Sequence, residues 1–174
     1  IEHIHDEVGH ARQGRPGAAE SFEILSCAVR GGINTLDTAR DYGEAEKVIG
    51  DFLDDERDRP SVNVITKFKI SRESLTDKKR VKEEVYSSLR ESCRLLKLER
   101  IPVCLFHMDR KLPVEEVLKV LPGILTDLKH DGLIDIGGVS ADHPREAELF
   151  LKHPELEAIQ LPLNVFDLLL AGKG

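Results

Sequence analysis

Apolar and polar positions along the chain predict helices and strands that alternate over most of its length. Apolar residues recur with the helical period in five segments, at residues 19–30, 44–53, 77–98, 114–129 and 144–152. Shorter β-prone or apolar runs lie between and after them, at residues 33–37, 62–68, 101–106, 133–139 and 156–161. Pro122 falls inside the fourth helical segment, so we expect that helix to kink or divide there.

This alternation indicates an α/β fold with a parallel sheet. The run at residues 101–106 is apolar almost throughout, which is typical of strands buried on both faces, and a helix before each strand favours right-handed crossover connections. We expect about five parallel strands with flanking helices. Residues 1–174 fit a single domain, with residues 1–18 as a loop or poorly ordered segment.

Composition and charge narrow the kind of partner. Hydrophobic residues make up 40% of the chain, enough for a core, and the net charge of -7 argues against nucleic acid or an anionic membrane surface as the main partner. No apolar run approaches the roughly 18 residues that span a bilayer. The cysteines Cys27, Cys93 and Cys104 lie in apolar-periodic segments, which predicts reduced, buried thiols in a cytoplasmic protein. The sequence leaves the oligomeric state open.

Polar residues stand at the ends of successive predicted strands. In chain order they are Asp37, Lys67, His107, Ser140, and Gln160 with Asn164. Because the carboxyl ends of parallel strands open onto one edge, we expect these side chains to meet at one mouth.

Tyr42, five residues after Asp37, adds a group that can exchange a proton. An ordinary tyrosine has a pKa near 10, so it is a poor proton donor at neutral pH. A lysine such as Lys67 favours the phenolate by charge, and a carboxylate such as Asp37 holds the ammonium in place. A histidine such as His107 can orient a carbonyl oxygen or share the proton. The set predicts proton transfer to a carbonyl oxygen.

The same residues lie in segments that resemble one known family. Residues 32–50, GINTLDTARDYGEAEKVIG, are similar to the signature of the aldo-keto reductases. Four further segments resemble that family in order and spacing: VITK at 64–67, LFHMD at 105–109, GVS at 138–140 and AIQLPLN at 158–164. The resemblance covers roughly residues 12–167.

This resemblance implies a (β/α)8 TIM barrel and an NAD(P)H-dependent oxidoreductase that reduces a small aldehyde or ketone by hydride transfer from the nicotinamide. Tyr42 would then be the proton donor. Lys67 and Asp37 would favour its phenolate, and His107 would orient the substrate carbonyl.

The cofactor implied by the resemblance is NADPH, with NADH as the other option. Ser140 and Gln160 would hold the nicotinamide, and Asp37 would lie close to its ribose. Ala141 stands where the family usually has an asparagine that binds the carboxamide. Because such a barrel needs about 250 residues, we expect a partial barrel that lacks its last three βα units, which carry the cofactor phosphate and adenine contacts in the family.

Two other interpretations stay open. His3 and His5 could be the first-strand ligands of a metal-dependent barrel hydrolase, with Lys67 and His107 as further ligands. Alternatively, the chain could be a non-catalytic or truncated family member that acts through protein partners, because an incomplete parallel sheet exposes edges and apolar helix faces.

Overall fold

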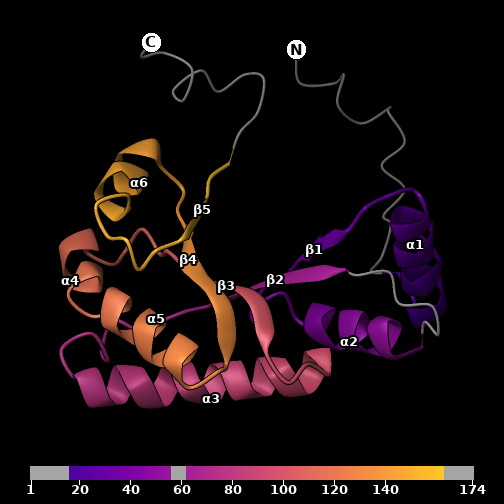
Figure 1. The fold of residues 1–174 in the computed structure, drawn as a ribbon, viewed down its shortest axis with the longest axis horizontal. Coiled ribbons are helices and arrows are strands. Elements are labelled where there is room, and N and C mark those ends of the chain that lie inside the picture. Colours follow the sequence, from indigo (N-terminus) through magenta and orange to yellow (C-terminus); the bar gives the residue numbers. More distant parts are fainter. Residues whose placement is uncertain (1–15, 56–61, 163–174) are drawn as a thin grey trace, which may run out of the picture.

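The computed structural model describes residues 16–55 and 62–162, which form one five-stranded sheet flanked by helices. The strands are β1 (Thr35–Asp37), β2 (Asn63–Phe68), β3 (Ile101–His107), β4 (Ile134–Ser140) and β5 (Ala158–Gln160). Each pairs in parallel with the next, in the order β1-β2-β3-β4-β5. The sheet curls into a half-barrel, and helices cover its outer side (Figure 1). The predicted α/β fold with five parallel strands is confirmed.

The described residues contain six helices, one before the first strand and five between successive strands. They are α1 (Ala18–Arg30), α2 (Ala45–Asp55), α3 (Lys78–Leu96), α4 (Val114–Leu118), α5 (Leu121–His130) and α6 (Pro144–Phe150). The predicted helix at 114–129 is divided in two, and Pro122 lies in the first turn of α5, where a proline does not interrupt backbone hydrogen bonding. Among the described residues no helix is long and apolar enough to cross a membrane.

Helix α1 lies at the edge of the fold, and none of its residues is buried. It packs on α2 through Phe22, whose ring meets that of Phe52 edge-on, with 5.7 Å between centroids. Cys27 is exposed, so the prediction of a buried thiol there is wrong: its helix contacts the rest of the fold along one side. Cys104 is buried, as expected, whereas Cys93 is only partly buried, and burial raises the pKa of both thiols.

The hydrophobic core lies between the sheet and the helices. Its strand contribution includes Phe68, Cys104, Phe106 and Val139, which pack against α3, α4 and α5. A smaller cluster joins β1 and β2 to α2 and α3 through Leu36, Val64, Phe52 and Leu96, among others. These strand residues mark the face of the sheet that is turned toward the helices.

The strand register places the polar strand-end residues on the opposite face. Side chains alternate between faces along a strand, and register partners in neighbouring strands share a face. Asp37 pairs with Ile65, two residues from Lys67, and Lys67 pairs with Leu105, two residues from His107. His107 pairs with Ser140, which pairs with Gln160. All five therefore belong to the inner face of the half-barrel.

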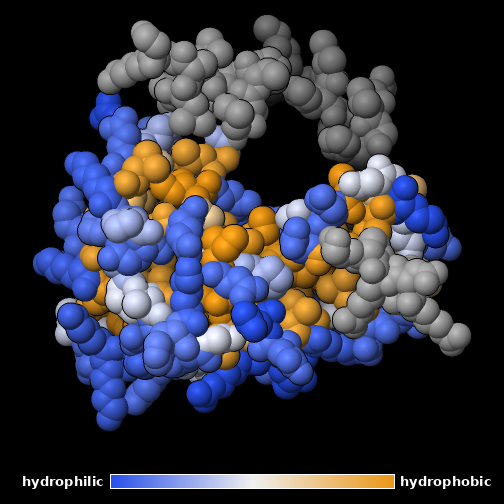
Figure 2. Space-filling view, in the orientation of Figure 1, coloured by the Kyte–Doolittle hydropathy of each residue, from blue (hydrophilic) through white to orange (hydrophobic). Residues whose placement is uncertain are grey.

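That inner face is hollowed and partly apolar. The space-filling view shows hydrophobic residues gathered along the hollow between the α1–α2 end and the α6 end (Figure 2). Ile136 belongs to this face because it pairs with Val103, and its side chain is 40% exposed. The strand-end residues thus stand at the carboxyl rim of an open, partly apolar concavity.

Candidate active site

A nearly buried ion pair forms the base of the site. Lys67, at 2% side-chain exposure, donates to both carboxylate oxygens of Asp37 at 2.7 Å and to the backbone carbonyl of Thr38 at 3.0 Å. The three donors of the ammonium thus meet three acceptors, which offsets the cost of removing its charge from water. The loop after β1 is also anchored to β2, since the N–H of Arg40 donates to the carbonyl of Lys67. The position of Lys67 is therefore set by two strands.

Tyr42 lies beside this ion pair on the segment that leads to α2. Its ring centroid is 5.5 Å from Nζ of Lys67, within the range of a cation–π contact. The ring of His107 meets it edge-on, with 6.2 Å between centroids and 86° between planes. Tyr42 is 49% exposed, so a ligand in the concavity can reach it. The four residues predicted as catalytic are brought together.

Ser140 and Gln160 complete the rim. Ser140 is the register partner of His107 on β4, and Gln160 is the partner of Ser140 on β5. The side-chain amide of Gln160 donates to Oδ1 of Asp37 at 3.2 Å, a contact between the last strand and the first. The predicted cofactor residues therefore adjoin the ion pair, while Asn164 lies outside the described residues.

A second charged pair at the site was not among the predicted residues. Lys69 donates to Asp41, and the other oxygen of Asp41, Oδ1, is 3.6 Å from Nδ1 of His107. Burial raises the pKa of Asp41, but the hydrogen bond from Lys69, a backbone hydrogen bond and the charges of Lys69 and His107 together lower it below its ordinary value. The sequence carried a signal for both residues, because Asp41 directly precedes Tyr42 and Lys69 follows Lys67 by two positions.

The metal interpretation receives no support from the part of the chain that the structure describes. Residues 16–55 and 62–162 contain no group of three or more His, Cys, Asp or Glu side chains that could hold a metal ion. His3 and His5 lie outside the described residues.

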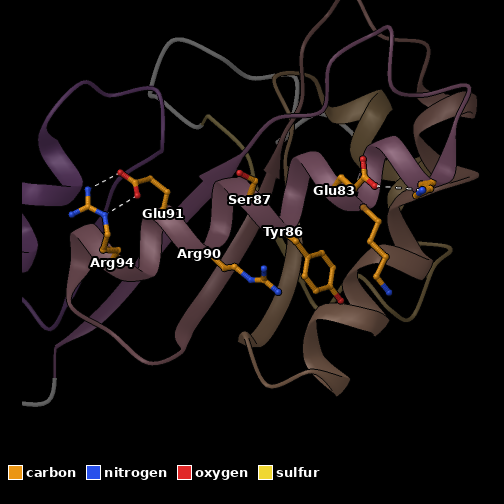
Figure 3. A pocket seen from close by; sticks show the side chains of 8 residues that line it. Glu83, Tyr86, Ser87, Arg90, Glu91 and Arg94 are labelled. Carbon is orange, nitrogen blue, oxygen red and sulfur yellow. Dashed lines mark hydrogen bonds and ion pairs between the residues drawn. The ribbon is translucent and has the colours of Figure 1, made fainter.

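One surface groove adjoins the predicted site residues, and a larger recess lies away from them. Tyr42 lines a groove of about 480 Å³ together with residues of α1 and α2. A larger, open recess of about 970 Å³ is lined by eight residues of α3 alone, including Tyr86 (Figure 3). The larger recess contains none of the predicted site residues, so its size does not make it the better candidate.

Comparison with known proteins agrees with the geometry. A sequence model described as the Aldo/keto reductase family matches residues 8–169. Curated protein sequences yield no match.

Solved structures with the same fold include several oxidoreductases. A Pseudomonas aeruginosa aldo-keto reductase is 26% identical with a TM-score of 0.69, over 87% of this chain and 58% of that protein. A glycerol dehydrogenase from Gluconobacter oxydans is 27% identical with a TM-score of 0.68, over 88% of this chain and 48% of that enzyme. An aldo/keto reductase from Klebsiella pneumoniae, solved with NADP and acetate, shares the fold at 21% identity and a TM-score of 0.58, over 80% of this chain and 44% of that protein.

This chain thus spans about half the length of the solved relatives that it matches. The family match covers nearly all of its residues, and the curled parallel sheet and the order of its strand-end residues agree with that match. The chain belongs to the aldo/keto reductase family.

Proposed function

We propose that this chain carries the catalytic centre of an oxidoreductase that reduces a small aldehyde or ketone with a nicotinamide nucleotide. The observation that carries the proposal is the convergence of Tyr42, Lys67, Asp37 and His107 at the carboxyl rim of one sheet face. Sites in α/β barrels are built at this rim. The family match supports the same class of reaction.

In the proposed step the Tyr42 hydroxyl gives its proton to the carbonyl oxygen of the substrate. The phenolate that remains is stabilised by the Lys67 ammonium, which Asp37 holds through two hydrogen bonds of 2.7 Å. His107, edge-on to the tyrosine ring, orients the carbonyl oxygen toward Tyr42. Each of these roles uses a contact that already exists between the residues.

The residues at the rim fit the nicotinamide end of the cofactor. The Gln160 amide and the Ser140 hydroxyl are neighbours in register and supply both donors and acceptors for a carboxamide. Asp37 supplies an acceptor for a ribose hydroxyl. Ala141 adds no polar side chain, and its backbone N–H donates to the carbonyl of Gln160. A bound nicotinamide would supply the hydride, and we propose NADPH as the cofactor, with NADH as the other option.

The test compares the two tyrosines of the chain. In the full-length protein, Tyr42→Phe should lower kcat for carbonyl reduction by about 100-fold or more, because a general acid is lost, with NADPH binding largely kept. Tyr86→Phe is the matched control: Tyr86 lies on α3, and its hydroxyl donates to Asp131. Turnover would be measured from NADPH absorbance and binding from NADPH fluorescence. Residual turnover of Tyr42→Phe near the wild-type rate would refute the proposed proton donor.

A family member that acts through protein partners is the second candidate function. It is favoured by the exposed Ile136 on the inner face and by β1 and β5, which are the edge strands of the described sheet. The same NADPH titration separates the two functions. A protein that binds no NADPH and reduces no carbonyl compound would support the second.

A further inference from the structure

His107 has one ring nitrogen whose partner the proposed reaction does not explain. Its Nδ1 is shielded from solvent and has no hydrogen-bond partner among residues 16–55 and 62–162. A buried polar atom without a partner is costly, so a group that can satisfy it is expected nearby. Oδ1 of Asp41 lies 3.6 Å away, just beyond hydrogen-bond reach.

Asp41 is suited to meet this nitrogen as a charged acceptor. Its other oxygen, Oδ2, takes a hydrogen bond from Lys69, which leaves Oδ1 turned toward His107. Although burial alone raises the pKa of Asp41, the bond from Lys69 and the charges of Lys69 and His107 lower it overall, so the carboxylate is ionised at neutral pH.

The other groups around His107 do not offer such an acceptor. Tyr42 presents its ring edge-on, and Lys67 lies over that ring with its ammonium committed to Asp37 and Thr38. On β4 the register partner Ser140 is uncharged.

We infer that Asp41, held by Lys69, is a positioning residue that accepts the Nδ1–H of His107 and so fixes the hydrogen of the neutral ring on Nδ1. The hydrogen bond of one ring nitrogen decides the state of the other, so Nε2 is the ring nitrogen left to face the substrate. The purpose of this arrangement rests on the proposed carbonyl reduction, but the protonation state itself can be measured without catalysis.

The experiment is long-range ¹H–¹⁵N NMR of the protein labelled with ¹⁵N-histidine, recorded at a pH at which the histidine rings are neutral. The chain has seven histidines, and His107→Gln identifies the signals of interest. In the wild type, the neutral ring of His107 should be the Nδ1–H tautomer. Asp41→Asn should shift the neutral ring toward the Nε2–H tautomer, because the anionic acceptor for Nδ1–H is lost. Asp41→Glu should restore most of the Nδ1–H form.

Asp109→Asn is the matched control. This carboxylate lies two residues from His107 along the chain, and its Oδ1 accepts from the backbone N–H of Lys111. It should leave the tautomer of His107 unchanged. An Nε2–H tautomer in the wild type would overturn the inference, and so would equal shifts in Asp41→Asn and Asp109→Asn. These outcomes are independent of the proposed reaction, which the Tyr42 variant tests separately.

Discussion

The buried carboxylate of Glu46 binds residues next to the site, although it has no role in the proposed reaction. Glu46 is 1% exposed; Oε1 accepts from the hydroxyl of Thr66 at 2.7 Å and Oε2 from Arg40 at 3.1 Å. Arg40 belongs to the loop between Asp37 and Tyr42, and its backbone N–H donates to Lys67. The ion pair between Arg40 and Glu46 thus anchors the loop that carries Tyr42.

Arg40→Met should lower the free energy of unfolding by about 2 kcal/mol, because it leaves the buried Glu46 charge without its cation. The double variant Arg40→Met with Glu46→Gln should lose less than Arg40→Met alone, since an amide can still accept from Thr66 and no charge stays buried. Urea unfolding of the two single variants and the double variant checks this. Strictly additive losses would contradict the proposed coupling.

The site residues that lie at strand ends could be predicted from the sequence. Asp37, Lys67, His107, Ser140 and Gln160 close successive strands, and parallel pairing carries them to one rim whatever the curvature of the sheet. The approach of Asp41 to His107 was not predictable in this way. It depends on how the loop after β1 folds back over β3, and no local pattern encodes that distance.

At the scale of elements, the signature stretch has a structural explanation at its closing glycine. Gly50 lies in α2, where an added Cβ would come 2.0 Å from the backbone carbonyl oxygen of Leu95 and 2.8 Å from Cα of Leu96. Both belong to α3, so the glycine allows the two helices to pack with their backbones in contact.

Gly50→Ala should therefore lower the free energy of unfolding by about 2–3 kcal/mol, because α2 and α3 would have to separate. Gly123→Ala is the contrasting variant. Gly123 lies in α5, and an added Cβ there has no heavy atom within 4 Å. Alanine at this site should raise stability by up to about 1 kcal/mol, since it restricts the unfolded chain and favours the helix. Thermal or urea unfolding measures both, and a Gly50→Ala protein as stable as the wild type would rule out the close packing.

Element boundaries followed local signals where those signals were strong. The segment predicted at 77–98 forms α3 from Lys78, and Asp77 caps it by accepting from the N–H groups of Lys79 and Arg80. Strand β1 begins at Thr35 and not at residue 33, and Ile33 is exposed. A local side-chain cap sets the first boundary, whereas the second is set by pairing, because β1 pairs with β2 from Thr35 onward.

Across the described residues, hydrogen bonds and ion pairs at the surface lower the pKa values of several carboxyl groups. Their pKa values lie below the ordinary 3.8 of aspartate or 4.5 of glutamate, chiefly through hydrogen bonds from Lys47 to Asp51, Arg94 to Glu91, Tyr86 to Asp131 and Lys129 to Glu157. A lowered folded-state pKa gives stability that is present above the unfolded value and is lost as the pH falls through the folded value.

The contribution of these groups to the free energy of unfolding should therefore be constant above about pH 5. It should decrease as the pH falls from there to about 3. The urea concentration at the midpoint of unfolding, measured across this pH range, tests the direction of this change in stability. High salt should reduce the decrease, because exposed pairs are screened. A midpoint that rises on acidification would contradict the assigned pairs.

The local pattern of the sequence determined the alternation of helices and strands, the parallel sheet and the order in which site residues reach its rim, because periodicity and strand ends are properties of short segments. The tertiary structure decided which residues touch. The Gln160–Asp37 contact joins residues 123 positions apart, and Asp41, in the loop after β1, comes within 3.6 Å of His107 on β3. The exposure of Cys27 and the requirement for glycine at position 50 likewise follow from what packs beside a helix. Such contacts depend on the curl of the sheet and on helix crossings, which arise from packing between distant parts of the chain.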